Sequence, residues 1–202
     1  MAIITSITKQ KKGERVNIFI DDEFYCGLDC LTLLKYSLKE GMEIDPEALS
    51  CIQTESERQS ATDKAFAYAT KYFKPERKIR EYLKEKGYVK ELINEIVAKL
   101  KDYGYVDDEK YATTYVSINA ERKGVNKIKM DLLNAGIPQR IVALALEELD
   151  GQYGACLKYA KRYASCHQPL DKNKLMRHLY SKGFAFEDIK RACNNLDEED
   201  EE

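Results

Sequence analysis

The sequence has no tryptophan, only two histidines and four prolines, and no CxxC pair. A structural zinc site needs about four converging ligands, most often cysteine and histidine. Disulfide frameworks are typical of short secreted chains, whereas the six cysteines here are scattered over 202 residues. We therefore expect free thiols, no metal site and no cofactor.

Long apolar runs are also missing. A membrane-spanning helix needs about 20 consecutive apolar residues, and no segment approaches that length. The first residues, MAIITSITKQKKGERV, lack the basic and then apolar order of a signal peptide. We expect a protein without a membrane segment, located in the cytoplasm.

Sequence motifs for catalysis are absent too. Neither GxxxxGK[ST] nor a GxGxxG after a strand is present, and the histidines and serines suggest no nucleophile and base. We expect no enzymatic activity.

The first third of the chain has β-branched, partly alternating segments. IITSIT at 3–8 and RVNIFI at 15–20 flank a glycine-bearing KKGE and predict a hairpin, with DDEFYCG at 21–27 as a third short strand. Asp45 followed by Pro46 is a favourable helix start. We expect helix from there to Phe73, with one break at most.

Beyond residue 60 the same pattern occurs three times. Each copy has a glycine, an apolar residue directly after it, and a leucine four residues before it; the glycines are Gly87, Gly136 and Gly183. Apolar residues after each glycine follow helical spacing, and another amphipathic run precedes each copy. The pattern predicts three tandem three-helix modules with glycine at the second turn.

We therefore expect a mainly α protein, a monomer in which the modules form an elongated curved rod after a small N-terminal β-hairpin region. The expected boundaries are 1–60 for the hairpin and its helical region, then 61–103, 104–150 and 151–196 for the modules. The final residues, 197–202, are all acidic. A block of like charges is expected to be a disordered tail.

The segment GYVDDEKYA at 104–112 carries three acids, which raises the question of a metal or catalytic site. A structural explanation is more specific. Gly104 is placed to end one helix in a left-handed conformation, and Asp107 to cap the next one. Asp108 then lies in the first turn, where a carboxylate interacts favourably with the helix dipole.

Basic residues recur near the second helix of each module. Without the acidic tail the chain has 33 basic and 29 acidic residues. Such residues can bind phosphate or an acidic protein surface, although solvated helix faces would also explain any single one. The candidates for partner binding are Arg77, Lys78, Arg80, Lys84, Arg122, Lys123, Lys127, Lys129, Lys161, Arg162 and Arg177.

Four segments together resemble the RecX family of regulatory proteins, which modulate the RecA recombinase. They are PERKIREYLKEKG at 75–87, GYVDDEKYATTYV at 104–116, ERKGVNKIKMDLLNAGI at 121–137 and KLMRHLYSKGF at 174–184. The chain departs from the family at Arg77-Lys78, where many members have arginine followed by serine or threonine.

The resemblance implies a protein that binds the RecA filament on single-stranded DNA and lodges in its groove. Family members inhibit the ATPase activity and strand exchange of RecA, or limit filament growth, and so damp homologous recombination and the SOS response. Two alternatives remain open: direct DNA or RNA binding through helix-turn-helix modules, and a scaffold for an unrelated protein partner. The first is weakened by RIVALALEELD at 140–150, a recognition-helix candidate that ends acidic.

The module assignment predicts that Leu132→Asp unfolds the middle module, because a carboxylate replaces an apolar side chain in its core. A thermal melt followed by circular dichroism measures this. A melting curve identical to that of the wild type would contradict the assignment.

Overall fold

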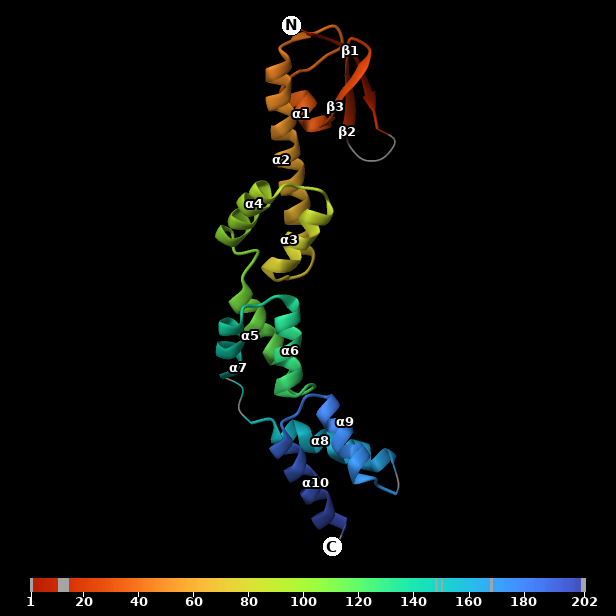
Figure 1. Ribbon diagram of the computed structural model, residues 1–202, viewed down its shortest axis with the longest axis vertical. Helices are drawn as coiled ribbons and strands as arrows, with labels where there is room; N and C mark the ends of the chain where they lie inside the picture. The colour runs from red at the N-terminus through yellow and green to blue at the C-terminus, as the bar shows by residue number, and fades with distance from the viewer. Residues whose placement is uncertain (1, 11–14, 148, 150, 168, 201–202) are drawn as a thin grey trace. The chain divides into compact units, whose positions relative to one another are not determined.

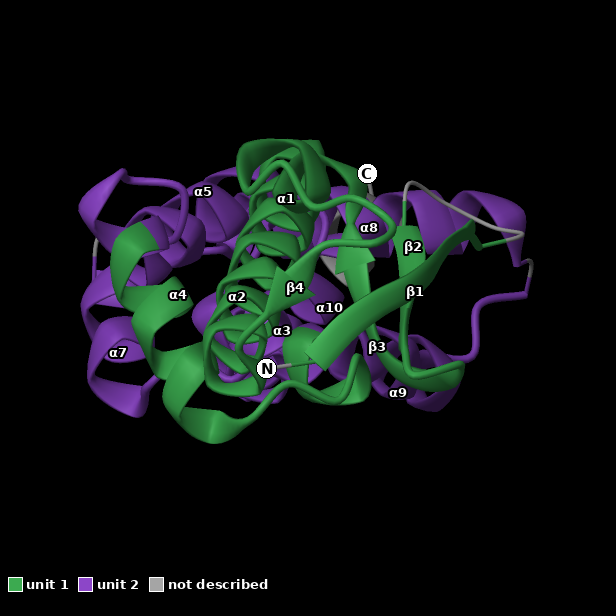
Figure 2. Ribbon diagram, turned by 90° about the horizontal axis from the view of Figure 1, so that it is seen from above, with its two compact units in different colours: residues 1–71, 83–99 green, residues 72–82, 100–202 purple. Residues whose placement is uncertain are grey.

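The computed structural model describes residues 2–10, 15–147, 149, 151–167 and 169–200, with side chains as far as residue 196 (Figure 1). The chain forms two compact units, Met1–Lys71 with Leu83–Lys99, and Tyr72–Tyr82 with Leu100–Glu202 (Figure 2). The predicted fold class is confirmed: the described residues are mostly helical, with antiparallel strands only near the N-terminus.

The first unit begins with a four-stranded antiparallel sheet in the order β3-β2-β1-β4. The strands are β1 (Ala2–Lys9), β2 (Arg15–Ile20), β3 (Glu23–Asp29) and β4 (Glu43–Ile44). The predicted hairpin and third strand are therefore present. The fourth strand was not predicted, because two residues are too short to show an alternating pattern.

Two helices pack with this sheet: α1 (Cys30–Lys35) and α2 (Pro46–Lys71). Asp45 Oδ1 accepts a hydrogen bond from the Glu47 backbone N–H (3.3 Å) at the expected start of α2. The core of the sheet includes Ile18 and Leu49, both fully buried. Because α2 is continuous, the predicted boundary at residue 60 falls inside this helix.

The remaining helices follow the predicted three-helix pattern. They are α3 (Glu76–Glu85), α4 (Lys90–Asp102), α5 (Asp108–Asn119), α6 (Val125–Ala135), α7 (Gln139–Glu147), α8 (Tyr153–Cys166), α9 (Lys172–Ser181) and α10 (Phe186–Asp200). We call α5–α7 module 2 and α8–α10 module 3; module 1 comprises the end of α2 with α3 and α4 and belongs partly to each unit.

Modules 2 and 3 have separate hydrophobic cores. Ile128, Leu132 and Val142 are buried in module 2. Leu179 and Phe184 are buried in module 3. In each of these two modules, the leucine four residues before the glycine is buried in the core. It lies on the inner face of the module's second helix, α6 or α9.

The glycine turns have left-handed backbone. The φ angles are +85° at Gly87, +72° at Gly104, +93° at Gly136 and +88° at Gly183. Residues with a side chain rarely adopt this conformation, so each helix before these turns can end within one or two residues.

The acidic C-terminal block differs from its prediction. Helix α10 continues to Asp200, so the backbone of 197–200 is helical rather than disordered; Glu201 and Glu202 lie outside the described residues. Extending a helix costs far less than starting one. The packed part of α10, which includes Leu196, therefore supports a further helical turn.

Modules 2 and 3 meet backbone to backbone. The Gly124 N–H donates to the Lys182 carbonyl (2.9 Å), and the Asn126 N–H donates to the Gly183 carbonyl (3.1 Å). A Cβ atom on Gly124 would lie 2.0 Å from the carbonyl carbon of Gly183. This position therefore has no room for a side chain, and its role was not predicted.

We predict that Gly183→Ala destabilises the chain more than Gly87→Ala. Both substitutions place a side chain at positive φ, a cost of about 1–2 kcal/mol. At Gly183 the new Cβ also meets Lys127 Cβ and N at 2.4 Å, whereas Gly87 has open space around it. Overpacking of this kind adds roughly 1–3 kcal/mol.

Urea denaturation of the two variants measures the difference. Gly154→Ala, at an unobstructed site in α8, is the control and should leave stability unchanged or slightly higher. Equal losses for Gly183→Ala and Gly87→Ala would show that the close approach carries no cost.

Candidate partner interface

The segment 104–112 is a helix junction in the structure. The Tyr105 N–H donates to the Leu100 carbonyl (2.9 Å) as α4 ends, and Asp107 Oδ1 accepts from the Lys110 N–H (2.9 Å) at the start of α5. Both contacts satisfy backbone groups that a helix end would otherwise leave unpaired. Among the described residues, no group of three or more His, Cys, Asp or Glu side chains is placed to hold a metal.

Asp108 has a role that its position in the sequence did not reveal. Its Oδ1 accepts a hydrogen bond from the Glu76 backbone N–H (2.9 Å), the first residue of α3. Burial raises the pKa of the Asp108 carboxyl, and the nearby Glu76 carboxylate adds to this, while the hydrogen bond opposes both. Asp108 therefore caps α3 of the preceding module. This contact comes in addition to the predicted favourable interaction of its carboxylate with the dipole of its own helix, α5.

Three of the four predicted cations of module 1, Arg77, Lys78 and Arg80, form ion pairs. Arg77 and Lys78 both contact Glu81 (2.8 Å each), and Arg80 contacts Glu76 (2.6 Å). Lys101 also reaches Glu76 (2.5 Å). Burial opposes ionisation of Glu76, but these bonds outweigh it and lower the pKa of its carboxyl. Lys84 is exposed, with no ion pair among the described residues.

Lys123 is part of an internal network in module 2. Its Nζ lies 2.7 Å from Asp131 Oδ2 and 2.7 Å from the Tyr115 hydroxyl. These hydrogen bonds raise the pKa of the Lys123 ammonium. Lys127 reaches the same carboxylate more weakly, at 3.5 Å. Lys123 is thus partly buried and bonded to residues of its own module. The sequence alone did not distinguish it from the other basic residues.

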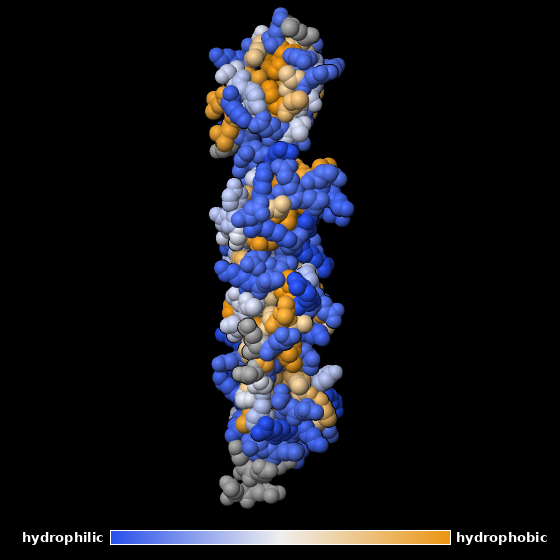
Figure 3. Space-filling view, turned by 90° about the vertical axis from the view of Figure 1, so that its left-hand side faces the viewer, coloured by the Kyte–Doolittle hydropathy of each residue, from blue (hydrophilic) through white to orange (hydrophobic). Residues whose placement is uncertain are grey.

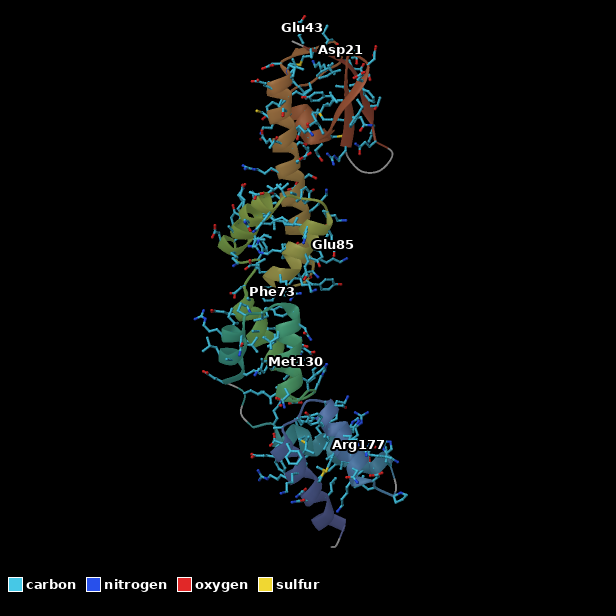
Figure 4. The ribbon with its side chains drawn as sticks, in the orientation of Figure 1. Asp21, Glu43, Phe73, Glu85, Met130 and Arg177 are labelled. Carbon is cyan, nitrogen blue, oxygen red and sulfur yellow. The ribbon has the colours of Figure 1, made fainter. Side chains whose placement is uncertain are left out.

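The remaining predicted cations are more accessible. Five side chains from modules 2 and 3 are exposed: Arg122, Lys129, Lys161, Arg162 and Arg177. In the part of the chain that the structure describes, Arg122, Lys129, Arg162 and Arg177 form no ion pair. In Figure 4, Arg177 projects from α9 and the exposed Met130, next to Lys129, from α6.

Hydrophobic side chains also reach the surface of module 2. Ile118 is 61% exposed and Met130 is 54% exposed. On the face shown in Figure 3, hydrophobic residues form small patches among hydrophilic ones. An exposed apolar side chain such as Met130, next in sequence to the exposed Lys129, is suited to contact with another macromolecule.

No helix among the described residues has the length and apolar character to cross a membrane. The fold and these surfaces define a protein of tandem three-helix modules whose exposed features are those of a binding protein. The comparisons with known proteins agree. Residues 2–45 match the regulatory protein RecX N-terminal domain, and residues 155–193 match the third three-helix domain of RecX.

Full-length relatives extend this match. The chain is 34% identical to the regulatory protein RecX of Clostridium tetani, over 96% of this chain and 94% of the relative. It is 31% identical to that of Bacillus licheniformis, over 100% of this chain and 80% of the relative. The chain belongs to the RecX family of regulatory proteins, which confirms the resemblance inferred from the sequence and points to a non-catalytic role.

Solved structures give the same result. A crystal structure of a regulatory protein RecX has a TM-score of 0.65 with 26% identity, covering 96% of this chain and 100% of that one. RecX from Lactobacillus salivarius has a TM-score of 0.60 with 26% identity, covering 69% of this chain and 96% of that one.

We predict that Lys123→Ala lowers the free energy of unfolding by about 1–2 kcal/mol, because it removes two hydrogen bonds from a partly buried carboxylate and hydroxyl. Lys129→Ala, an exposed change in the helix α6 that follows Lys123, should stay within ~0.5 kcal/mol of the wild type. Chemical denaturation compares the two. Equal stabilities would show that the Lys123 network contributes nothing.

Proposed function

We propose that the chain binds the RecA recombinase assembled as a filament on single-stranded DNA, and that it restrains the filament's ATPase activity, strand exchange and growth. It would thereby damp homologous recombination and the SOS response. Membership of the RecX family supports a regulatory role. In this proposal the chain acts as a monomer in the cytoplasm and needs no cofactor.

The observation that carries this proposal is that some of the predicted cations form ion pairs within the chain, whereas others are exposed and unpaired in the described part of it. Arg122 and Lys129 in module 2 are exposed and carry no ion pair among the described residues, as do Arg162 and Arg177 in module 3. An unpaired cation can bind a partner carboxylate or phosphate without first giving up an internal contact. These four residues form the centre of the proposed interface.

Other predicted contacts are secondary in this proposal. Arg77, Lys78 and Arg80 would have to exchange their bonds to Glu81 and Glu76 for bonds to the partner. Lys123 and Lys127 share Asp131 in the same way. Lys84 and Lys161 are exposed and are included at the edge of the interface.

Direct reading of duplex DNA is less well supported. In a helix-turn-helix protein, the first residues of the last helix contact the base edges in the major groove. Here α10 starts with Phe186, Glu187 and Asp188. Carboxylates at that position repel phosphate, so module 3 is a poor reader of the major groove. No specific observation favours the other alternative, a scaffold for an unrelated protein partner.

We predict that Arg122→Glu weakens inhibition of the single-stranded-DNA-dependent ATPase activity of RecA. The concentration for half inhibition should rise about fivefold, equivalent to ~1 kcal/mol, because attraction becomes repulsion at one contact. Lys110→Glu is the matched control. It makes the same charge change on an exposed residue of module 2 outside the proposed interface, and it should inhibit like the wild type.

The wild-type protein separates the alternatives in the same assay. An unchanged ATPase rate with retardation of DNA alone would favour direct nucleic-acid binding, and no effect on either would favour the scaffold. Full inhibition by Arg122→Glu at wild-type concentrations would refute the assigned interface while leaving the activity itself intact.

A further inference from the structure

Module 3 contains a depression of about 390 Å³ that the proposed interface does not use as a whole. It lies where the end of α8 meets α9, and its lining includes Tyr159, Arg162, Tyr163, His167, His178 and Lys182. Its volume falls in the range of small-ligand sites, about 300–1,000 Å³. Among the described residues the lining holds two cations, Arg162 and Lys182, and no carboxylate, so the depression is electropositive.

Aromatic rings form one wall. The rings of Tyr163 and His167 are stacked, with centroids 4.1 Å apart and planes 8° from parallel. His178 from α9 lies against the same tyrosine at 4.9 Å. His167 is exposed, so part of its ring surface remains accessible to a flat ligand.

Contacts with α8 and with the core of module 3 hold these rings in place. His167 Nδ1 lies 3.0 Å from the Tyr163 carbonyl oxygen, which holds the ring over the last turn of α8. Tyr159, one turn earlier, packs on the fully buried Phe184 (5.8 Å between centroids). The aromatic wall is therefore attached to the core of module 3, and its geometry exists before any ligand binds.

Cations lie beside the rings. Arg162 is exposed and forms no ion pair among the described residues. Lys182 places its Nζ 5.6 Å from the centre of the Tyr159 ring. Burial lowers the pKa of His178, and the charges of Lys182 and His167 add to this effect. Its imidazole is therefore neutral at pH 7, able to donate one hydrogen bond and accept another.

Cations near the ends of helices also offset the helix dipole, and that effect alone would explain Arg162 and Lys182. It does not explain the exposed ring stack beside them, or the lack of acids among the described residues of the lining. Rings with neighbouring cations are the combination that binds single-stranded nucleic acid, where bases stack and phosphates are neutralised.

We propose that this depression binds one nucleotide of a single-stranded nucleic acid, with the base stacked on His167 and the phosphate contacted by Arg162 and Lys182. The site would give module 3 a direct contact with the strand that a RecA filament carries. In that sense it deepens the proposed function, but it can be tested without the recombinase.

The test measures the binding of fluorescently labelled oligo(dT) and oligo(rU) to the full chain by anisotropy at low salt. His167→Ala should weaken binding at least fivefold, since it removes the stacking surface, and His167→Phe should restore most of the affinity. Arg162→Glu should weaken binding to a similar degree. Lys190→Glu, the same type of charge change on exposed α10 outside this depression, should have less than a twofold effect.

A preference for oligo(dT) or for oligo(rU) would identify the natural strand, and either preference supports the site. Equal weakening by Arg162→Glu and Lys190→Glu, with no effect of His167→Ala, would overturn it by showing diffuse electrostatic binding. Absence of binding by the wild type to both oligomers would also overturn it. The RecA ATPase assay with Arg122→Glu changes a residue outside this depression, so the two proposals can fail separately.

Discussion

The second unit depends on backbone contacts between successive modules. Gly124 and Asn126 donate hydrogen bonds to the turn at Gly183, and there is no space for a Cβ between Gly124 and that turn. Asp108 makes the corresponding contact one module earlier by capping α3. Gln152 adds another, since its amide donates to the carbonyls of Ala120 (2.8 Å) and Lys123 (2.9 Å). Because peptide groups are rigid and directional, the two bonds from Gly124 and Asn126 hold modules 2 and 3 in one relation, and the bonds from Gln152 reinforce it.

This constraint has a consequence for binding. Separate cores would let modules 2 and 3 move independently, and their exposed cations would then have no fixed spacing. With the backbone junction formed, Arg122 and Lys129 keep a constant relation to Arg162 and Arg177. A fixed set of contacts costs less entropy to bring onto a partner than a mobile one. The proposed interface and the nucleotide site of module 3 both rely on this order.

Much of the fold could be predicted from the sequence, because its signals are local and repeated. The glycine frame located α3 to α10, and the apolar spacing identified buried residues such as Leu132 and Leu179. Gly124 was missed because its need for glycine arises from a turn about 60 residues later, and the equivalent position in module 1 is Pro75. The same limit applies to Asp108 and Lys123, whose partners lie in other helices. Whether a given cation forms an ion pair depends on the fold. The sequence could therefore identify the basic residues but could not separate the paired ones from the unpaired ones.

Native-state hydrogen exchange at Gly124 and Asn126 tests the central claim most directly. If the two backbone bonds join the modules, both amides should exchange only through cooperative opening of modules 2 and 3, at rates similar to those of core amides such as Leu132 and Leu179. Exchange at the rate of unprotected amides, with the cores still protected, would show that the modules are linked only through the chain and would contradict the account.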